Sequence, residues 1–172
     1  MSRRRFLGSV AAALVSSRTA HAHADAPRAL RMVHTHTGER LDVSYFEAGA
    51  YDPAALQSID RFLRDFRTND VHPIDPGLLD LLCGLAALTE TGRPFAVISG
   101  YRSPRTNAAL RKRSEGVAAG SLHMKGQAID VRLADVPLPK LRSAALALRR
   151  GGVGYYPASD FVHVDVGRVR YW

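Results

Sequence analysis

Two short stretches of the sequence alternate apolar and polar side chains, Ala128-Ile129-Asp130-Val131-Arg132-Leu133 and Phe161-Val162-His163-Val164-Asp165-Val166. Such alternation predicts β-strands, because successive side chains of a strand point to opposite faces of the sheet. The branched apolar side chains then face a core, and the other face carries Asp130, His163 and Asp165. The alternation therefore predicts a sheet with one apolar face and one face suited to chemistry.

A further polar residue, His123, lies in a short loop before the first of these strands. Gly126 lies between His123 and Asp130 and lets the chain bend, so that the imidazole can return over the polar face. If the two strands are neighbours, the side chains of His123, Asp130 and His163 converge. Two imidazoles and one carboxylate, with a fourth position left to water, form the ligand set of a catalytic Zn²⁺ site. An iron site can use the same ligand types, but it is typical of a many-stranded jelly roll, and the predicted helices disfavour that fold.

The rest of the chain predicts helices and further strands around these two stretches. Short strands are predicted at 29–33, 41–46, 95–98 and 153–156, the first two joined in a hairpin by Thr35-His36-Thr37-Gly38-Glu39. Helices are predicted at 53–67 after Asp52-Pro53, from Asp75-Pro76 to Gly92, from Ser103-Pro104 to about 113, and over 138–148. The order of these elements predicts an α+β fold, with a small, mostly antiparallel sheet packed with helices.

The first residues of the chain predict export. Ser2-Arg3-Arg4-Arg5-Phe6-Leu7 is followed by a mildly apolar run too short to span a bilayer, and the small residues of 20–24 offer cleavage sites. The arginine pair is typical of a twin-arginine signal. We therefore predict a signal peptide over residues 1–24 and one domain over residues 25–172, located in the periplasm or elsewhere outside the cytoplasm.

The net charge of the chain falls when the predicted signal is set aside. The full sequence has 24 basic and 16 acidic residues, a net charge of +8, and four of the arginines lie in residues 1–24, which leaves +4. This balance suits a protein that works near an anionic polymer, and no basic run carries the interleaved aromatics of a nucleic-acid-binding protein. Cys83 is the only cysteine, so an intrachain disulfide is excluded, and its position within a helix predicts a buried, inert thiol.

Three segments resemble a known family of zinc peptidases. Residues 121–130 match the spaced pattern S-x-H-x-x-G-x-A-x-D of the peptidases related to D-alanyl-D-alanine peptidases. Residues 161–167 resemble the terminal metal-ligand strand of that family, and Ser99-Gly100-Tyr101-Arg102-Ser103 resembles its S-G-Y-R-[ST] segment. As a whole, the chain is similar to the twin-arginine-exported murein endopeptidases of this M15-type, hedgehog-like group.

The resemblance implies a zinc-dependent hydrolase that cleaves peptide cross-links of peptidoglycan with metal-activated water. It implies that Zn²⁺ is bound by His123, Asp130 and His163, that Arg102 holds a substrate carbonyl or carboxylate, and that Ser121 helps to position the substrate. A guanidinium there also stabilises an oxyanion, and removing such a donor commonly costs about 10²–10³ in rate. Tyr155 is a further candidate for substrate contact, although one of Tyr155 and Tyr156 is expected to belong to the core.

The general base is the point at which the sequence departs from the family pattern. Many relatives place a glutamate three residues before the last ligand or a histidine two before it, where this chain has Asp160 and Phe161. Asp165 shares the predicted face of His163, so it is either the base or a partner that orients His163. We favour Asp165 over Asp160, whose side chain is shorter than a glutamate.

The main alternative function is a non-catalytic, zinc-containing module that binds the cell wall, because a fold alone does not establish turnover. A cysteine peptidase is disfavoured by the position of Cys83 within a helix, and a serine hydrolase by the lack of a G-x-S-x-G motif. The sequence leaves D,D cross-links, L,D cross-links between diamino-acid residues and stem-peptide bonds open as substrates. We favour cleavage of cross-links by a monomeric enzyme.

Overall fold

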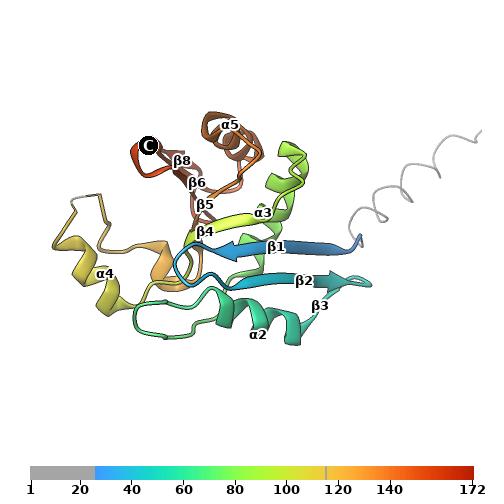
Figure 1. Ribbon diagram of the computed structural model, residues 1–172, viewed down its shortest axis with the longest axis horizontal. Helices are drawn as coiled ribbons and strands as arrows, with labels where there is room; N and C mark the ends of the chain where they lie inside the picture. The colour runs from blue at the N-terminus through green and yellow to red at the C-terminus, as the bar shows by residue number, and fades with distance from the viewer. Residues whose placement is uncertain (1–25, 115) are drawn as a thin grey trace, which may run out of the picture.

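A mixed, largely antiparallel sheet forms the frame of the protein in a computed structural model that describes residues 26–114 and 116–172 (Figure 1). Its strand order within this part of the chain is β3-β2-β1-β4-β5-β7-β6-β8. The helices pack around the sheet, so the predicted α+β class is confirmed. The predicted signal peptide of residues 1–24 lies outside the described residues. No helix among the described residues is long and apolar enough to span a membrane.

The N-terminal side of the sheet is the predicted hairpin of β1 (Arg28–His34) and β2 (Arg40–Glu47). Gly38 in its turn has a φ of 74°, a conformation that favours glycine. The two-residue strand β3 (Ala50–Tyr51) pairs antiparallel with β2 at the edge of the sheet and was not predicted. On its other side β1 pairs in parallel with β4 (Phe95–Ser99), so one parallel pairing joins the hairpin to the rest of the sheet.

Two helices begin at the predicted Asp-Pro signals, α2 (Pro53–Phe62) and α3 (Pro76–Thr89). The carboxylates of Asp52 and Asp75 accept hydrogen bonds from the free amides of the first turns, as N-caps do. The prediction that the first helix continues to residue 67 was wrong, because α2 ends at Phe62. The carbonyl of Leu63 accepts a hydrogen bond from the Tyr101 amide at 2.7 Å, which takes it out of the helical pattern.

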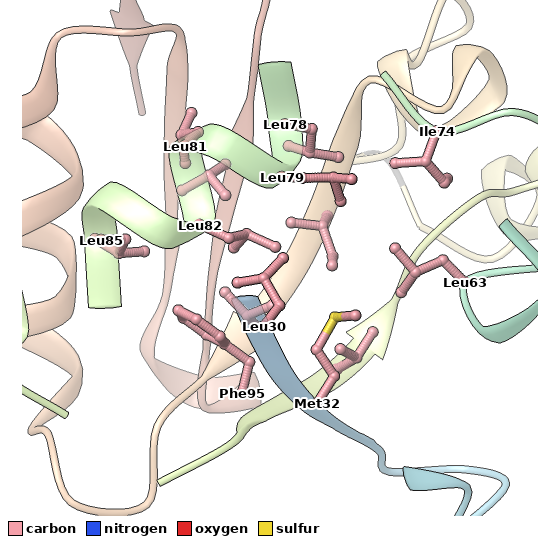
Figure 2. Close-up of a cluster of buried hydrophobic side chains, with 14 of the residues drawn as sticks. Leu30, Met32, Leu63, Ile74, Leu78, Leu79, Leu81, Leu82, Leu85 and Phe95 are labelled. Carbon is pink, nitrogen blue, oxygen red and sulfur yellow. The ribbon is translucent and has the colours of Figure 1, made fainter. Parts of the chain in front are cut away.

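The core lies between α3, α5 (Leu138–Leu148) and the apolar face of the sheet. Figure 2 shows the leucines of α3 above Leu30, Met32 and Phe95 from β1 and β4. Complete burial of a leucine contributes about 1.5–3 kcal/mol, and Leu78, Leu79, Leu82 and Leu85 are all fully buried. Cys83 lies on the same helix but is only partly buried, which corrects the prediction of a buried thiol.

The remaining elements include the predicted helix after Ser103-Pro104 and the predicted strands near 128–133, 153–156 and 161–166, together with two 3₁₀ turns and a last short strand that were not predicted. They are α4 (Pro104–Arg111), the 3₁₀ turns η1 (Leu122–Lys125) and η2 (Pro157–Ser159), and strands β5 (Ala128–Arg132), β6 (Gly152–Tyr156), β7 (Phe161–Asp165) and β8 (Arg170–Tyr171). Strand β7 lies between β5 and β6 and is antiparallel to both. The short strand β8 was not predicted and pairs in parallel with β6.

Candidate metal centre

The register of β5 and β7 brings two predicted ligands together. Asp130 and His163 are direct partners in this antiparallel pair. The neighbouring residues Ile129, Val131, Val162 and Val164 are fully buried in the core on the other face. The alternation of apolar and polar residues thus places the carboxylate and the imidazole side by side on the face opposite α3 and α5.

The third predicted ligand, His123, reaches the same face from η1. This turn ends at Gly126, whose φ is 65°. A Cβ atom at Gly126 would collide with the carbonyl of Pro73, so both the backbone conformation and the close approach require glycine. The Nδ1 atom of His123 lies 2.7 Å from the carbonyl oxygen of Gly100, which directs Nε2 toward Asp130 and His163.

The three side chains converge on one point. His123 Nε2 lies 3.2 Å from both His163 Nδ1 and Asp130 Oδ1, and His163 Nδ1 lies 2.9 Å from Asp130 Oδ1. Tetrahedral ligands about 2.0–2.1 Å from a metal ion are separated by roughly 3.3 Å, which is close to these distances. Among the described residues, this is the group of histidines and acids whose donor atoms are close enough to hold a metal.

In each histidine, one ring nitrogen points toward Asp130 and the other, the outer nitrogen, points away from it. The hydrogen bonds of the outer nitrogens show whether the inner ones can bind a cation. His123 Nδ1 donates to the Gly100 carbonyl, and His163 Nε2 donates to Asp165 Oδ2 at 3.1 Å. With a hydrogen on each outer nitrogen, the neutral rings turn two lone pairs toward the Asp130 carboxylate. Three electron-rich atoms then meet at one point, which is the arrangement that binds a divalent cation.

The ionisable groups of the site depend strongly on one another. In the metal-free protein, in which the ring nitrogens next to Asp130 can also carry a proton, burial raises the pKa of Asp130, but the charges of and hydrogen bonds from His123 and His163 outweigh burial, and the pKa falls below its usual range. Burial lowers the pKa of His163, while hydrogen bonds to Asp130 and Asp165 raise it to a greater extent. Asp130 is therefore the ionised centre of the group.

Asp165 lies behind His163 and is completely buried. Besides His163, its carboxylate accepts hydrogen bonds from the Gly152 and Gly167 amides at 3.0 and 2.8 Å. Arg170 donates two more through its guanidinium, at 3.0 and 2.7 Å. Burial raises the pKa of Asp165, yet these donors together lower it below its usual range. The side chain is therefore an ionised support for the outer nitrogen of His163.

Asp160 is placed differently. Its side chain is 65% exposed and pairs with Arg132 at 3.1 Å on the molecular surface. Its backbone has a φ of 53°, at the end of η2. Neither Asp160 nor Asp165 lines the cavity above the donor atoms, where Asp130 is the carboxylate that the described residues contribute.

This cavity has a volume of about 280 Å³, with His123, Asp130 and His163 at its floor. Arg102 and Ser121 also line the cavity, and the Arg102 guanidinium lies 3.5 Å from Asp130 Oδ2. The Nε atom of Arg102 is buried and has no hydrogen-bond partner among the described residues. Burial lowers the pKa of Arg102 and the charge of Asp130 opposes that shift. The Arg102 side chain borders the cavity, so its guanidinium is placed to meet a substrate oxygen.

Three aromatic side chains also line the cavity: Tyr156, Phe161 and Trp172. Phe161 and Trp172 were not predicted to do so, whereas the expectation that one of Tyr155 and Tyr156 belongs to the core is confirmed. Tyr155, the predicted substrate contact, lies on the opposite face of β6, where it packs against the core beside the Arg142 guanidinium. Side chains alternate along β6, so Tyr155 and Tyr156 face opposite sides of the sheet. Tyr156 is the partner of Phe161, which lies on the same face of β7 as His163, so this pairing places Tyr156 rather than Tyr155 at the site.

The donor set and the open cavity define the class of site, a candidate divalent-metal centre on the polar face of the sheet in an α+β protein. The chain belongs to the family Peptidase_M15_2, described as peptidoglycan L,D-endopeptidase MepK, whose family model matches residues 22–172. The peptidoglycan L,D-endopeptidase MepK of Escherichia coli (strain K12) is 47% identical over 146 residues, which is 85% of this chain and 80% of the relative.

A second relative is the probable peptidoglycan L,D-endopeptidase MepK of Haemophilus influenzae (strain ATCC 51907 / DSM 11121 / KW20 / Rd). It is 48% identical over 147 residues, which cover 85% of this chain and 79% of the relative. The family resemblance expected from residues 99–103, 121–130 and 161–167 is therefore confirmed.

Proposed function

We propose that the protein is a zinc-dependent endopeptidase that cleaves L,D cross-links in peptidoglycan. The observation that carries this proposal is the convergence of His123, Asp130 and His163 at the floor of an open cavity. The family match over residues 22–172 and the names of two relatives that are nearly half identical support the choice of L,D cross-links.

The choice of zinc follows from the donor atoms. Two imidazole nitrogens and one carboxylate oxygen, with one side open to the cavity, suit Zn²⁺ in a catalytic rather than a structural site. When bound, this ion lowers the pKa of a water molecule to about 7 and polarises a substrate carbonyl. Asp130 and the neutral imidazoles of His123 and His163 would hold the ion, and the outer N–H groups of the two rings are fixed by the Gly100 carbonyl and Asp165.

Arg102 and Ser121 are the proposed substrate-binding residues of the cavity. The guanidinium of Arg102 lines the cavity beside Asp130, where it is placed to hold a substrate carbonyl or carboxylate and the oxyanion that forms during hydrolysis. Ser121 is nearly buried, and its hydroxyl forms no hydrogen bond to the described residues, so it is free to orient the same substrate group.

The sequence left open whether Asp165 or Asp160 is the general base. We propose that Asp165 positions His163 and that Asp160 takes no part in the reaction. The five hydrogen bonds to Asp165 leave it no access to the cavity. The pairing of Asp160 with Arg132 on the surface supports the second statement.

Chromatography of purified murein peptides tests the proposed function. Mature protein loaded with zinc is expected to remove L,D-cross-linked dimers, and chelation or His163→Ala is expected to abolish this loss. Intact dimers in the presence of one bound zinc per chain would overturn the proposal and favour a non-catalytic wall-binding module. Comparison of zinc with other divalent ions in the same assay identifies the metal that supports activity.

We also propose that residues 1–24 direct export by the twin-arginine route, so that the enzyme acts outside the cytoplasm. The start of the family match at residue 22 supports a domain boundary close to this point. The double substitution Arg4→Lys and Arg5→Lys is expected to retain the uncleaved protein in the cytoplasmic fraction. Normal export of that variant would contradict the proposed route.

A further inference from the structure

One face of β6 carries glycines where side chains would be expected. Gly152 and Gly154 lie on the same face as Asp165 and His163 of the neighbouring strand β7, and Gly154 is the direct partner of His163. A Cβ atom at Gly152 would collide with the guanidinium of Arg170 and with the Asp165 carboxylate. A Cβ atom at Gly154 would lie only 2.8–2.9 Å from three atoms of the Trp172 indole. The two glycines thus let side chains from the β8 segment cross over β6.

These crossings bring two residues to the metal centre from a strand that does not itself touch β7. Arg170 reaches across Gly152 to Asp165. Trp172 reaches across Gly154 to the ligand His163, with the two ring centroids 5.3 Å apart. Arg170 therefore supports His163 indirectly through Asp165, whereas the indole lies directly beside the ligand and borders the cavity.

The indole is held firmly although it is 48% exposed. Its Nε1–H group donates to the hydroxyl of Tyr156 at 2.7 Å. The main chain of Trp172 donates to Val153 and accepts from Tyr155, and the Arg170 guanidinium lies 5.0 Å from the indole ring. A large aromatic ring that is fixed on several sides, yet half exposed within a cavity, has the properties of a binding surface.

Two kinds of side chain line the cavity. The guanidinium of Arg102 lies 3.5 Å from Asp130 Oδ2, and that of Arg170 lies beside Trp172. Trp172, Tyr156 and Phe161 form an aromatic wall, in which the rings of Tyr156 and Phe161 stack at 4.6 Å. A ligand that carries both an oxygen anion or carbonyl and an aliphatic chain is complementary to this combination.

We propose that Trp172 is a substrate-binding residue that selects L,D cross-links by packing against the methylene chain of a diamino-acid residue. This inference rests on the proposed function. An L,D cross-link has a diamino-acid residue on each side of the cleaved bond, whereas a D,D cross-link has a D-alanine on the carbonyl side. The longer aliphatic chain gains contact area on the indole that a single methyl group does not.

Three variants test the selection of cross-links. Trp172→Ala removes the wall, Trp172→Phe keeps an aromatic ring without the bond to Tyr156, and Gly154→Ala displaces the indole without deleting it. Each is assayed with purified L,D- and D,D-cross-linked dimers, with the zinc content and thermal unfolding midpoint measured in parallel. Trp172→Ala and Gly154→Ala are expected to lower kcat/KM for the L,D dimer by roughly tenfold through KM, with Trp172→Phe retaining most of it.

The ratio of the two substrates decides the outcome. The preference for L,D over D,D dimers is expected to fall in Trp172→Ala and to be largely kept in Trp172→Phe. An unchanged KM and preference in Trp172→Ala would overturn the proposal, as would an equal loss in all variants that follows loss of zinc. If the wild-type protein cleaves neither dimer, the proposed function itself has failed.

The fluorescence of the wild-type protein gives a test that needs no substitution at the site. Trp172 is the only tryptophan of the chain, so its emission reports on this wall alone. Rapid mixing of zinc-loaded protein with the L,D dimer is expected to give a saturable change in emission before cleavage. Constant emission at dimer concentrations that saturate turnover would overturn the inference.

Discussion

His34 and the pair His123 and His163 are all nearly buried, but their surroundings differ. The ring of His34 meets the rings of Phe62 and Phe66 edge-on, with centroids 6.1 and 5.3 Å away. Its Nδ1 atom accepts a hydrogen bond from the His36 amide, and its Nε2 atom has no partner among the described residues. The rings of His123 and His163 instead face a shared carboxylate.

The comparison shows that burial alone does not make a histidine a metal ligand. The pKa of His34 is lowered, first by burial and then by the nearby charge of His36, so the ring stays neutral within an aromatic cluster. At the metal centre the pKa of His163 is raised, because hydrogen bonds to Asp130 and Asp165 outweigh burial. The decisive features are a carboxylate on the same face and an acceptor for each outer nitrogen.

Among the substitutions that test this comparison, Asp130→Asn is expected to have the largest effect on zinc binding and activity. The substitution keeps the shape of the side chain but removes the charge that makes the histidine pair a cation site. Because loss of a residue behind a ligand already costs about 10–100-fold, we expect loss of a ligand to lower zinc affinity by more than about 100-fold. Calorimetric titration with zinc and the murein assay measure both consequences. Retained stoichiometric binding would contradict the assignment of Asp130 as a ligand.

Asp165→Asn is expected to have an intermediate effect and distinguishes the two roles that the sequence left open. If Asp165 orients His163, zinc affinity falls about 10–100-fold, and activity recovers in part at high zinc concentration. A normal zinc affinity with a lower kcat would instead identify Asp165 as the base. Asp160→Asn is the matched control, and the exposure of Asp160 predicts unchanged affinity and activity.

His34→Leu is expected to have the smallest effect and to leave zinc content and activity unchanged. The substitution removes a buried N–H group that has no partner, which is favourable, but it also removes the acceptor of the His36 amide, which is unfavourable. Because the two effects oppose each other, the free energy of unfolding should change by about 1 kcal/mol or less. Thermal unfolding and the murein assay check this. A loss of activity would show that the aromatic cluster supports the metal centre.

The same variant has a predictable pH dependence. Since the pKa of His34 is lower in the folded protein than in the unfolded chain, the unfolded chain takes up the proton first. The wild-type protein should lose stability as the pH falls below about 6.5, the ordinary histidine pKa. His34→Leu should flatten this part of the profile, as measured by unfolding midpoints between pH 7 and 5. An identical profile would exclude His34 as a contributor.

The strands that carry Asp130 and His163 were predictable because their pattern is local and has a period of two. The sequence predicts that the two side chains meet only if their strands are neighbours, and the structure shows that β5 and β7 pair directly. The end of α2 was not predictable, since it depends on a hydrogen bond between Leu63 and Tyr101. Sequence also gave no sign of Trp172, which reaches the site through the nonlocal pairing of β8 with β6.

The anchoring of the outer histidine nitrogens has a consequence for how metal uptake relates to folding. Both anchors belong to the fold itself: the Gly100 carbonyl follows β4, and Asp165 is held by backbone amides and Arg170. The ligands therefore lose little conformational entropy on coordination. Little of the free energy of metal binding is needed to order the chain, so most of it contributes to metal affinity. In small zinc-finger domains the opposite holds, and the metal drives folding. Chelation of this protein should therefore switch off hydrolysis while its circular dichroism spectrum keeps the folded form.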